Sequence, residues 1–174
     1  MLNDRKIRGF TTIELLIVVM IMGILLTIAL PSFRNLMLNF QIRALAESIL
    51  NGVQLARSAA VQRNENVTFT LAGNGWTVTA ATAPLLIQSR PAGESASKVF
   101  TGALPSTATT VTFNGLGRVV NSTTDINTID VDVPTSAMPA AESRDLRIRI
   151  LPGGLVKLCD PNKTVSTDVT YCPL

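Results

Sequence analysis

An apolar run that contains one carboxylate constrains this chain more than any other feature of its sequence. From Ile13 to Leu30 the residues are apolar apart from Glu14, Gly23 and Thr27. A helix needs about 20 such residues to cross a bilayer, so the run is nearly long enough to form a span. A carboxylate at the centre of a span costs about 2.5–3.5 kcal/mol on insertion scales. Glu14 therefore calls for a partner that an isolated span does not provide.

Three kinds of segment begin with a short basic stretch before an apolar run. A secretory signal peptide would be cut after the run, near Thr27-Ile28-Ala29, and a signal anchor would not be cut. A third kind is cut before the run, on the cytoplasmic side. Cleavage after Gly9 would leave Phe10 with a free α-amine, and a neighbouring subunit could present this cation to Glu14. The carboxylate favours the third kind, because neither of the others has a use for it.

The residues around this position carry a family resemblance. The stretch from Arg8 to Leu16, Arg-Gly-Phe-Thr-Thr-Ile-Glu-Leu-Leu, resembles the class III signal of type IV pilins and type II secretion pseudopilins. The resemblance implies that a prepilin peptidase cuts between Gly9 and Phe10, that Phe10 is then N-methylated, and that Glu14 acts in filament assembly. Thr12 departs from the pattern, which usually has a larger apolar residue there.

The apolar run leads into an amphipathic segment. Pro31 should kink or locally melt a helix where the run ends. Beyond it, apolar residues recur at three- and four-residue steps, which predicts a helix with one buried stripe: Ile42, Leu45, Ile49, Val53, Ala56 and Ala60. Arg43 and Glu47 form an i, i+4 pair off this stripe. We expect one long helix from Phe10 to about Asn64.

After Val67 the apolar period becomes two, which is typical of β-strands. Gly73-Asn74-Gly75 indicates a hairpin turn, and segments Pro91 to Ser97 and Pro134 to Ser143 have loop composition. The expected strands are Val67–Leu71, Trp76–Ala80, Leu85–Gln88, Thr110–Phe113, Ile129–Val133, Leu146–Leu151 and Leu155–Cys159. We therefore predict an α+β fold in which the long helix packs on an antiparallel sheet.

The head carries a second resemblance. A helix ending Ala56 to Asn64, a turn from Phe113 to Arg118, and the stretch Gly153 to Pro161 together resemble the GspH/FimT group of minor pilins and pseudopilins. The resemblance implies a type IV pilin fold, divided as leader peptide 1–9, transmembrane and assembly helix half 10–31, amphipathic helix half 32–66, and β-rich head 67–174.

The two cysteines, Cys159 and Cys172, lie close to the end of the chain. A membrane-targeted N-terminus implies an exported head, where oxidation is permitted. A disulfide that closes a short C-terminal loop is the expected arrangement, and two free buried thiols are the alternative. A zinc site has little support, because the chain contains no histidine and no second cysteine pair.

The net charge of +3 does not by itself indicate a nucleic-acid partner, because eight basic and eight acidic residues balance from Val67 onward. No catalytic constellation, phosphate-binding loop or cofactor motif occurs, so we expect neither an enzyme nor a cofactor or metal. Asp130 and Asp132 share a strand face and could touch a cation, although such pairs are more often solvated.

One local cluster of basic residues stands out. Alternation along residues 145–150 places Arg147 and Arg149 on one face of a strand, a tight turn brings Lys157 near them, and Lys163 lies in the expected disulfide loop. In DNA-uptake members of the group, basic residues in this region are implicated in binding DNA. The competing interpretation is a polar strand face neutralised by Asp145 and Asp160.

The two resemblances together imply a minor pilin that primes or caps a type IV pilus. The alternatives are a type II secretion pseudopilin, a DNA receptor built as a pilin, and, remotely, an enzyme anchored by one helix. The implied partners are other major and minor pilins, the prepilin peptidase and the inner membrane, with DNA as a further candidate. The expected location is the inner membrane with a periplasmic head, followed by a pilus or pseudopilus at the cell surface.

Overall fold

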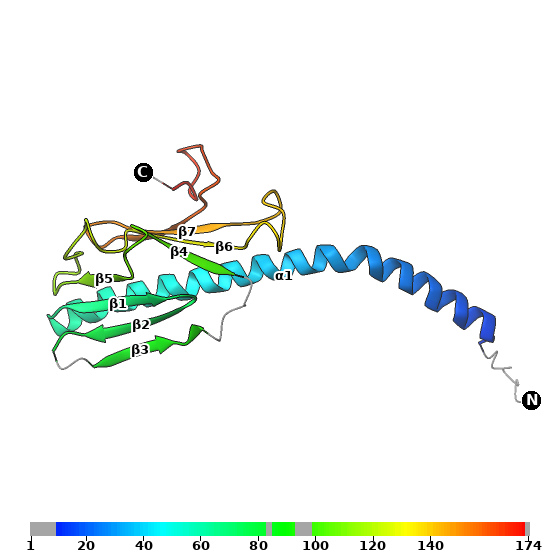
Figure 1. The fold of residues 1–174 in the computed structure, drawn as a ribbon, viewed down its shortest axis with the longest axis horizontal. Coiled ribbons are helices and arrows are strands. Elements are labelled where there is room, and N and C mark those ends of the chain that lie inside the picture. Colours follow the sequence, from blue (N-terminus) through cyan, green and yellow to red (C-terminus); the bar gives the residue numbers. More distant parts are fainter. Residues whose placement is uncertain (1–9, 83–84, 93–98, 173–174) are drawn as a thin grey trace, which may run out of the picture. The chain divides into compact units, whose positions relative to one another are not determined.

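The computed structural model describes residues 10–82, 85–92 and 99–172. The expected leader 1–9, with Gly9, and residues 93–97 of the expected loop at Pro91 to Ser97 lie outside these ranges. The described part contains one long helix followed by eight strands (Figure 1). It divides into two compact units, residues 1–36 and residues 37–174, which are described separately below.

Helix α1 spans Thr12–Arg63, close to the predicted Phe10 to Asn64. At its start, Thr11 Oγ1 accepts a hydrogen bond from the backbone N–H of Glu14 at 3.3 Å, so Thr11 caps the helix. At its end, Asn64 adopts a φ of 51°, the left-handed conformation that commonly terminates helices. We expected a kink or local melting at Pro31; the helix continues through this residue, so melting does not occur there.

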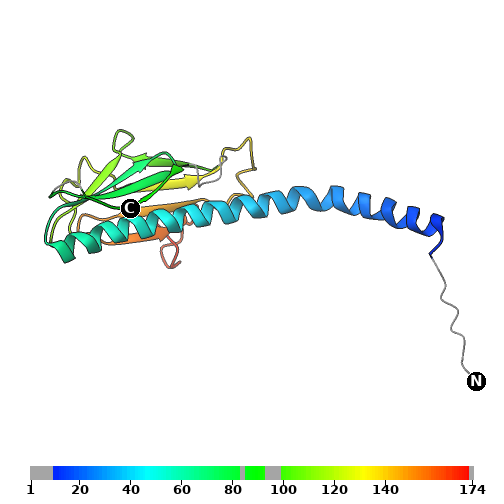
Figure 2. The same ribbon diagram turned by 90° about the horizontal axis from the view of Figure 1, so that it is seen from below.

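Residues 37–174 form the second unit, which is called the head from here on and includes part of α1 as well as the β-rich segment 67–174. The predicted stripe from Ile42 to Ala60 is buried in its core, and Arg43 lies 2.8 Å from Glu47, as the helical spacing predicts. The helical segment within the head lies against strands of both sheets (Figure 2).

The strands form two antiparallel sheets, ordered β3-β2-β1-β5 and β4-β6-β7-β8, where we expected one. Their bounds are β1 Val67–Ala72, β2 Gly75–Ala80, β3 Leu86–Arg90, β4 Phe100–Leu104, β5 Thr110–Phe113, β6 Thr128–Asp132, β7 Leu146–Ile150 and β8 Val156–Cys159. The predicted hairpin is present, with Ala72 paired to Gly75 across a turn in which Gly73 has a φ of 56°. Seven strands match predicted ones within about two residues.

Strand β4 is missing from the sequence prediction. Gly102 stands at its centre, and glycine weakens a strand pattern because it adds flexibility and offers no side chain to pack. β4 nevertheless pairs with β6, from Phe100 opposite Asp132 to Leu104 opposite Thr128. It lies at an edge of the second sheet, where one hydrogen-bonded neighbour holds it.

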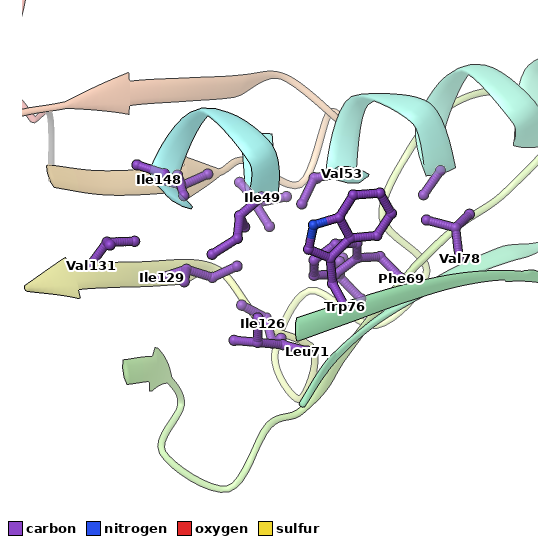
Figure 3. Close-up of a cluster of buried hydrophobic side chains, with 14 of the residues drawn as sticks. Ile49, Val53, Phe69, Leu71, Trp76, Val78, Ile126, Ile129, Val131 and Ile148 are labelled. Atoms are coloured by element: carbon purple, nitrogen blue, oxygen red, sulfur yellow. The ribbon is translucent and has the colours of Figure 1, made fainter. Parts of the chain in front are cut away.

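The core lies between the helix and the two sheets. Figure 3 shows Ile49 and Val53 of α1 among side chains from strands of both sheets, including Phe69 and Trp76 of the first sheet and Ile148 of the second. Phe69 and Trp76 stack with ring centroids 6.0 Å apart, and Trp76 donates to Ser48 Oγ at 3.1 Å. This common core explains why both sheets hold fixed positions against one helix face within the head.

Candidate functional site

The first candidate region is the start of α1. Glu14 occupies the third helical position after the cap at Thr11, where the N-terminal end of the helix dipole favours a negative charge. Its side chain is exposed, and it has no hydrogen-bond or ion-pair partner within the described residues. The sequence Thr11-Thr12-Ile13-Glu14 has the spacing of a capping box, a local signal that the sequence analysis missed.

The helix beyond Glu14 has an apolar surface. Within the first unit, large apolar side chains from Ile13 to Leu36 are exposed around the helix. α1 is long and apolar enough to cross a membrane, by its length and composition. A helix that is apolar on all sides is normally buried in lipid or protein, so this segment requires an apolar environment that the chain's first unit does not itself provide.

The second candidate region is the basic face of the second sheet. Arg147 of β7 binds Asp130 of β6 through two contacts, Nε to Oδ1 at 2.5 Å and Nη2 to Oδ2 at 3.0 Å. The hydrogen bond to Asp130 raises the pKa of Arg147, although partial burial opposes this. Asp130 neutralises Arg147, whereas we expected Asp145 and Asp160 to neutralise this face.

The other basic candidates are arranged differently. Arg149 and Lys157 face each other in the pairing of β7 with β8, as the sequence predicts. Lys157 Nζ donates to the carbonyl oxygen of Tyr171 at 3.0 Å. Lys163 lies in the C-terminal loop, 3.9 Å from Asp168 Oδ2. Of the four basic candidates, Arg149 and Lys157 therefore form a directly opposed cross-strand pair.

The C-terminal loop is closed by the Cys159–Cys172 disulfide, with sulfur atoms 2.01 Å apart. Asp160 and Tyr171 form a parallel β-bridge beside it, and the backbone N–H of Asp160 donates to the carbonyl oxygen of Thr170 at 2.8 Å. The loop is thereby held against the end of β8 by covalent and hydrogen bonds.

A junction between α1 and two tight turns was not foreseen from the sequence. Arg57 Nε donates to the carbonyl oxygen of Gly117 at 3.2 Å. Gly117 and Gly154 have φ values of 73° and 85°, and a Cβ atom on Gly154 would lie 1.8 Å from the Gly117 oxygen. The glycines were recognised as a family signature, but their direct contact with each other and with Arg57 requires the fold.

Acidic side chains gather at the end of β6. Asp132 Oδ1 accepts from the backbone N–H of Val133 at 2.5 Å, and the Ser143 hydroxyl, with its single proton, lies within hydrogen-bond distance of both Asp132 and Asp145. Burial and the neighbouring Asp145 raise the pKa of Asp132 to about 6. Asn39 of α1 holds the same loop, donating to Glu142 O at 3.0 Å and accepting from Arg144 N at 2.9 Å.

Asp130 and Asp132 have different partners, since Asp130 contacts Arg147 and Asp132 contacts Ser143 and the backbone N–H of Val133. In the part of the chain that the structure describes, no three side chains of the metal-ligating types cluster.

Comparison with known proteins identifies the family. Residues 45–154 match the family described as Type II transport protein GspH, and residues 4–30 match the prokaryotic N-terminal methylation motif. The chain belongs to the GspH family. This GspH-family chain is also similar in fold to the type IV minor pilin FimU of Pseudomonas aeruginosa. One crystal form gives 15% identity and a TM-score of 0.53, covering 70% of this chain and 90% of FimU.

A second crystal form of FimU gives 14% identity and a TM-score of 0.52, covering 70% of this chain and 94% of FimU. No curated protein matches the sequence significantly. The fold is therefore that of a pilin, as the sequence analysis predicted. GspH-family proteins are structural components that assemble with other pilins after processing by the prepilin peptidase, and this chain shares their apolar N-terminal helix and their methylation motif.

Proposed function

We propose that this GspH-family chain is a minor pilin of a type IV pilus that primes assembly or lies at the filament tip. The observation that carries the proposal is the exposed apolar surface of α1 from Ile13 to Leu36 in a chain whose head has the fold of FimU. Such a surface can be stored in a bilayer and then covered by the helices of neighbouring subunits. Both environments remove it from water, which stabilises the anchored subunit and the filament in turn.

Glu14 can favour movement of the subunit from the bilayer into the filament. We infer that cleavage between Gly9 and Phe10 creates the α-amine that pairs with Glu14 of a neighbouring subunit. The exposed carboxylate without a partner in the described chain supports this role. An unpaired carboxylate is unfavourable in lipid, and an ion pair in the filament would relieve that cost.

The choice between a pilus and a secretion pseudopilus rests on the fold comparison. The two solved structures with similar folds are minor pilins, which supports the pilus. The secretion pseudopilin is the alternative, because the matched family is described by a type II transport protein. The C-terminal disulfide supports a head in an oxidising compartment, the periplasm of a Gram-negative cell.

The test compares deletion strains that are complemented with the native chain, with Glu14→Ala, or with Glu47→Ala. Glu47 is the matched control, because its exposed carboxylate pairs with Arg43 on the head. We expect the deletion and Glu14→Ala to reduce surface pili in electron micrographs, and Glu47→Ala to restore them. Gold-labelled antibody should mark the filament ends. Normal pili together with lost secretion of type II substrates would instead assign the chain to the secretion system.

DNA uptake has weaker support. The basic face provides two neighbouring cations, Arg149 and Lys157, while Arg147 and Lys163 have acidic partners. Phosphate contacts by so few charges give weak, salt-sensitive and nonspecific binding. We expect no duplex DNA binding tighter than the nonspecific range of about 10⁻⁴–10⁻⁶ M at physiological salt, which titration of the purified full chain in detergent can measure.

A further inference from the structure

A pocket of about 530 Å³ opens where β4 ends and β6 begins. Its apolar walls include Leu104, Val119, Ile126 and Ile150, and its polar lining includes Arg149 and Asn127. It lies entirely in the head, between strands of the second sheet and the segment that follows Phe113. None of the residues that line it is acidic.

Arg149 differs from Arg147 in one decisive respect. Both extend from the same face of β7, and each stands opposite a residue of β6. Arg147 faces Asp130, which neutralises it, whereas Arg149 faces Thr128. On its other side Arg149 faces Lys157, another cation. Within residues 10–82, 85–92 and 99–172, no carboxylate pairs with Arg149, so a positive charge without a counter-charge lines the pocket.

A second donor lies beside this charge. Asn127 Oδ1 accepts a hydrogen bond from Thr128 Oγ1 at 2.9 Å, which leaves its Nδ2 group as a donor. In the described chain, this Nδ2 group makes no hydrogen bond. The nearby buried carboxylate of Asp125 accepts from the backbone N–H of Thr112 at 2.9 Å, on the first sheet. The polar lining thus offers donors, and the remaining walls offer apolar contact.

We propose that this pocket binds a carboxylate carried on an apolar residue of a peptide segment. The planar guanidinium of Arg149 matches the geometry of a carboxylate, and Asn127 donates a further hydrogen bond. The apolar walls hold the body of the bound residue. The carboxylate is that of a C-terminal residue or of an acidic side chain next to an apolar one. Both sources present the same chemistry to the pocket.

The test uses the full chain in detergent micelles, labelled with ¹⁵N, and follows the side-chain signals of Arg149 and Asn127. N-acetyl-leucine represents a chain end, and acetyl-Leu-Glu-amide represents an acidic side chain beside an apolar one. N-acetyl-leucinamide has the same apolar body as the first probe without its charge. We expect saturable shifts with at least one carboxylate probe in the millimolar range, and binding of the neutral amide at least tenfold weaker.

Three substitutions distinguish carboxylate binding in this pocket from general electrostatic attraction. Arg149→Gln should weaken carboxylate binding at least tenfold, while Arg147→Gln, the matched control on the same strand face, should leave it within about twofold. Asn127→Ala keeps the charge but removes the amide donor, so it should weaken binding less than Arg149→Gln does. Binding to each variant is followed by whichever of the two side-chain signals it retains, and unchanged backbone amide signals of β1 and β2 show that the head remains folded.

The stronger of the two carboxylate probes assigns the source as a chain end or a side chain. The proposal is wrong if neither probe shifts the two signals, if the neutral amide binds equally well, or if Arg147→Gln weakens binding as much as Arg149→Gln. It is also wrong if inorganic phosphate or a short DNA duplex at equal ionic strength shifts these signals at lower concentration than the carboxylates do, because the pocket would then be a general anion surface.

Discussion

The indole nitrogen of Trp76 donates a hydrogen bond to Ser48 Oγ at 3.1 Å and so joins β2 to α1 inside the head. Trp76 is 4% exposed, although Ser48 and Trp76 also line an open pocket of about 580 Å³. A buried donor that loses its acceptor costs about 1–3 kcal/mol. We therefore expect Ser48→Ala to lower the free energy of unfolding by about 1–2 kcal/mol, measured by denaturant titration of Trp76 fluorescence.

Ser58→Ala is the control for this prediction. Ser58 lies on the same helix, and its exposed hydroxyl donates only to the carbonyl oxygen of Leu55. The change should alter the free energy of unfolding by less than about 0.5 kcal/mol. Equal effects of the two substitutions would show that the bond to Trp76 contributes nothing specific.

The close contact between the turns at Gly117 and Gly154 predicts that a substitution of Gly154 strongly destabilises the head. A Cβ atom there would overlap the Gly117 carbonyl oxygen, and the φ of 85° disfavours any other residue. We expect Gly154→Ala to destabilise the head by more than about 2 kcal/mol. Gly153→Ala is the matched control, because a Cβ atom at Gly153 would have no neighbour within 4 Å. Thermal melting followed by circular dichroism compares the two, and similar melting temperatures would contradict the steric argument.

The raised pKa of Asp132 predicts that the stability of the head depends on pH. Its folded-state pKa of about 6 lies above the ordinary value of 3.8, so the folded head favours the protonated carboxyl. This contribution is fully present below about pH 4 and is lost as the pH rises through 6. Asp132→Asn keeps an uncharged group at every pH. It should be similar in stability to the native chain at pH 4.5 and about 1 kcal/mol more stable at pH 8, a modest value because the site is partly open to solvent.

Asp168→Asn should show the opposite pH dependence of stability, because the pKa of Asp168 is shifted in the opposite direction. Hydrogen bonds from Thr170 lower the pKa of Asp168, so its contribution is present at neutral pH and is lost on acidification. We expect this substitution to destabilise the head at pH 8 and to have less effect at low pH. A stability difference for Asp132→Asn that is the same at pH 4.5 and pH 8 would rule out titration of Asp132 as the cause.

The disulfide predicts a redox dependence of stability. Cys159 and Cys172 are 13 residues apart, and closing a loop of about this size is worth roughly 3 kcal/mol in the chain-entropy model. Reduction, or the change of both cysteines to serine, should lower the melting temperature of the head. Alkylation followed by mass measurement checks the redox state, and two free thiols in exported protein would contradict the predicted state.

The proposed processing predicts the mass of the mature chain. Membrane-extracted protein should lack residues 1–9 and carry one methyl group on the amine of Phe10, as measured by intact-mass and peptide spectra. Gly9→Val should block the cut, because the resemblance assigns this position to the residue before the scissile bond. An N-terminus near Leu30 would instead identify a secretory signal peptide.

The sequence predicted the helix and most strands because both have local periodic signals. Residues close together in the chain are enough to predict the stripe from Ile42 to Ala60 and the Gly73-Asn74 turn. The division into two sheets cannot be predicted in this way, because it depends on pairs of residues far apart in the sequence, such as Gly102 with Asp130. The same limit applies to the basic face, where alternation predicted the direction of Arg147 but cross-strand register decides that Asp130 neutralises it.

The C-terminal loop has a consequence for solubility. β8 ends the second sheet, and an open edge strand offers unpaired backbone groups to any other chain that approaches. The disulfide, the Asp160–Tyr171 bridge and the bond from Lys157 to the Tyr171 carbonyl place the chain's own tail at this edge. The tail therefore occupies the end of this edge beside Asp160, where it hinders another strand from pairing in register.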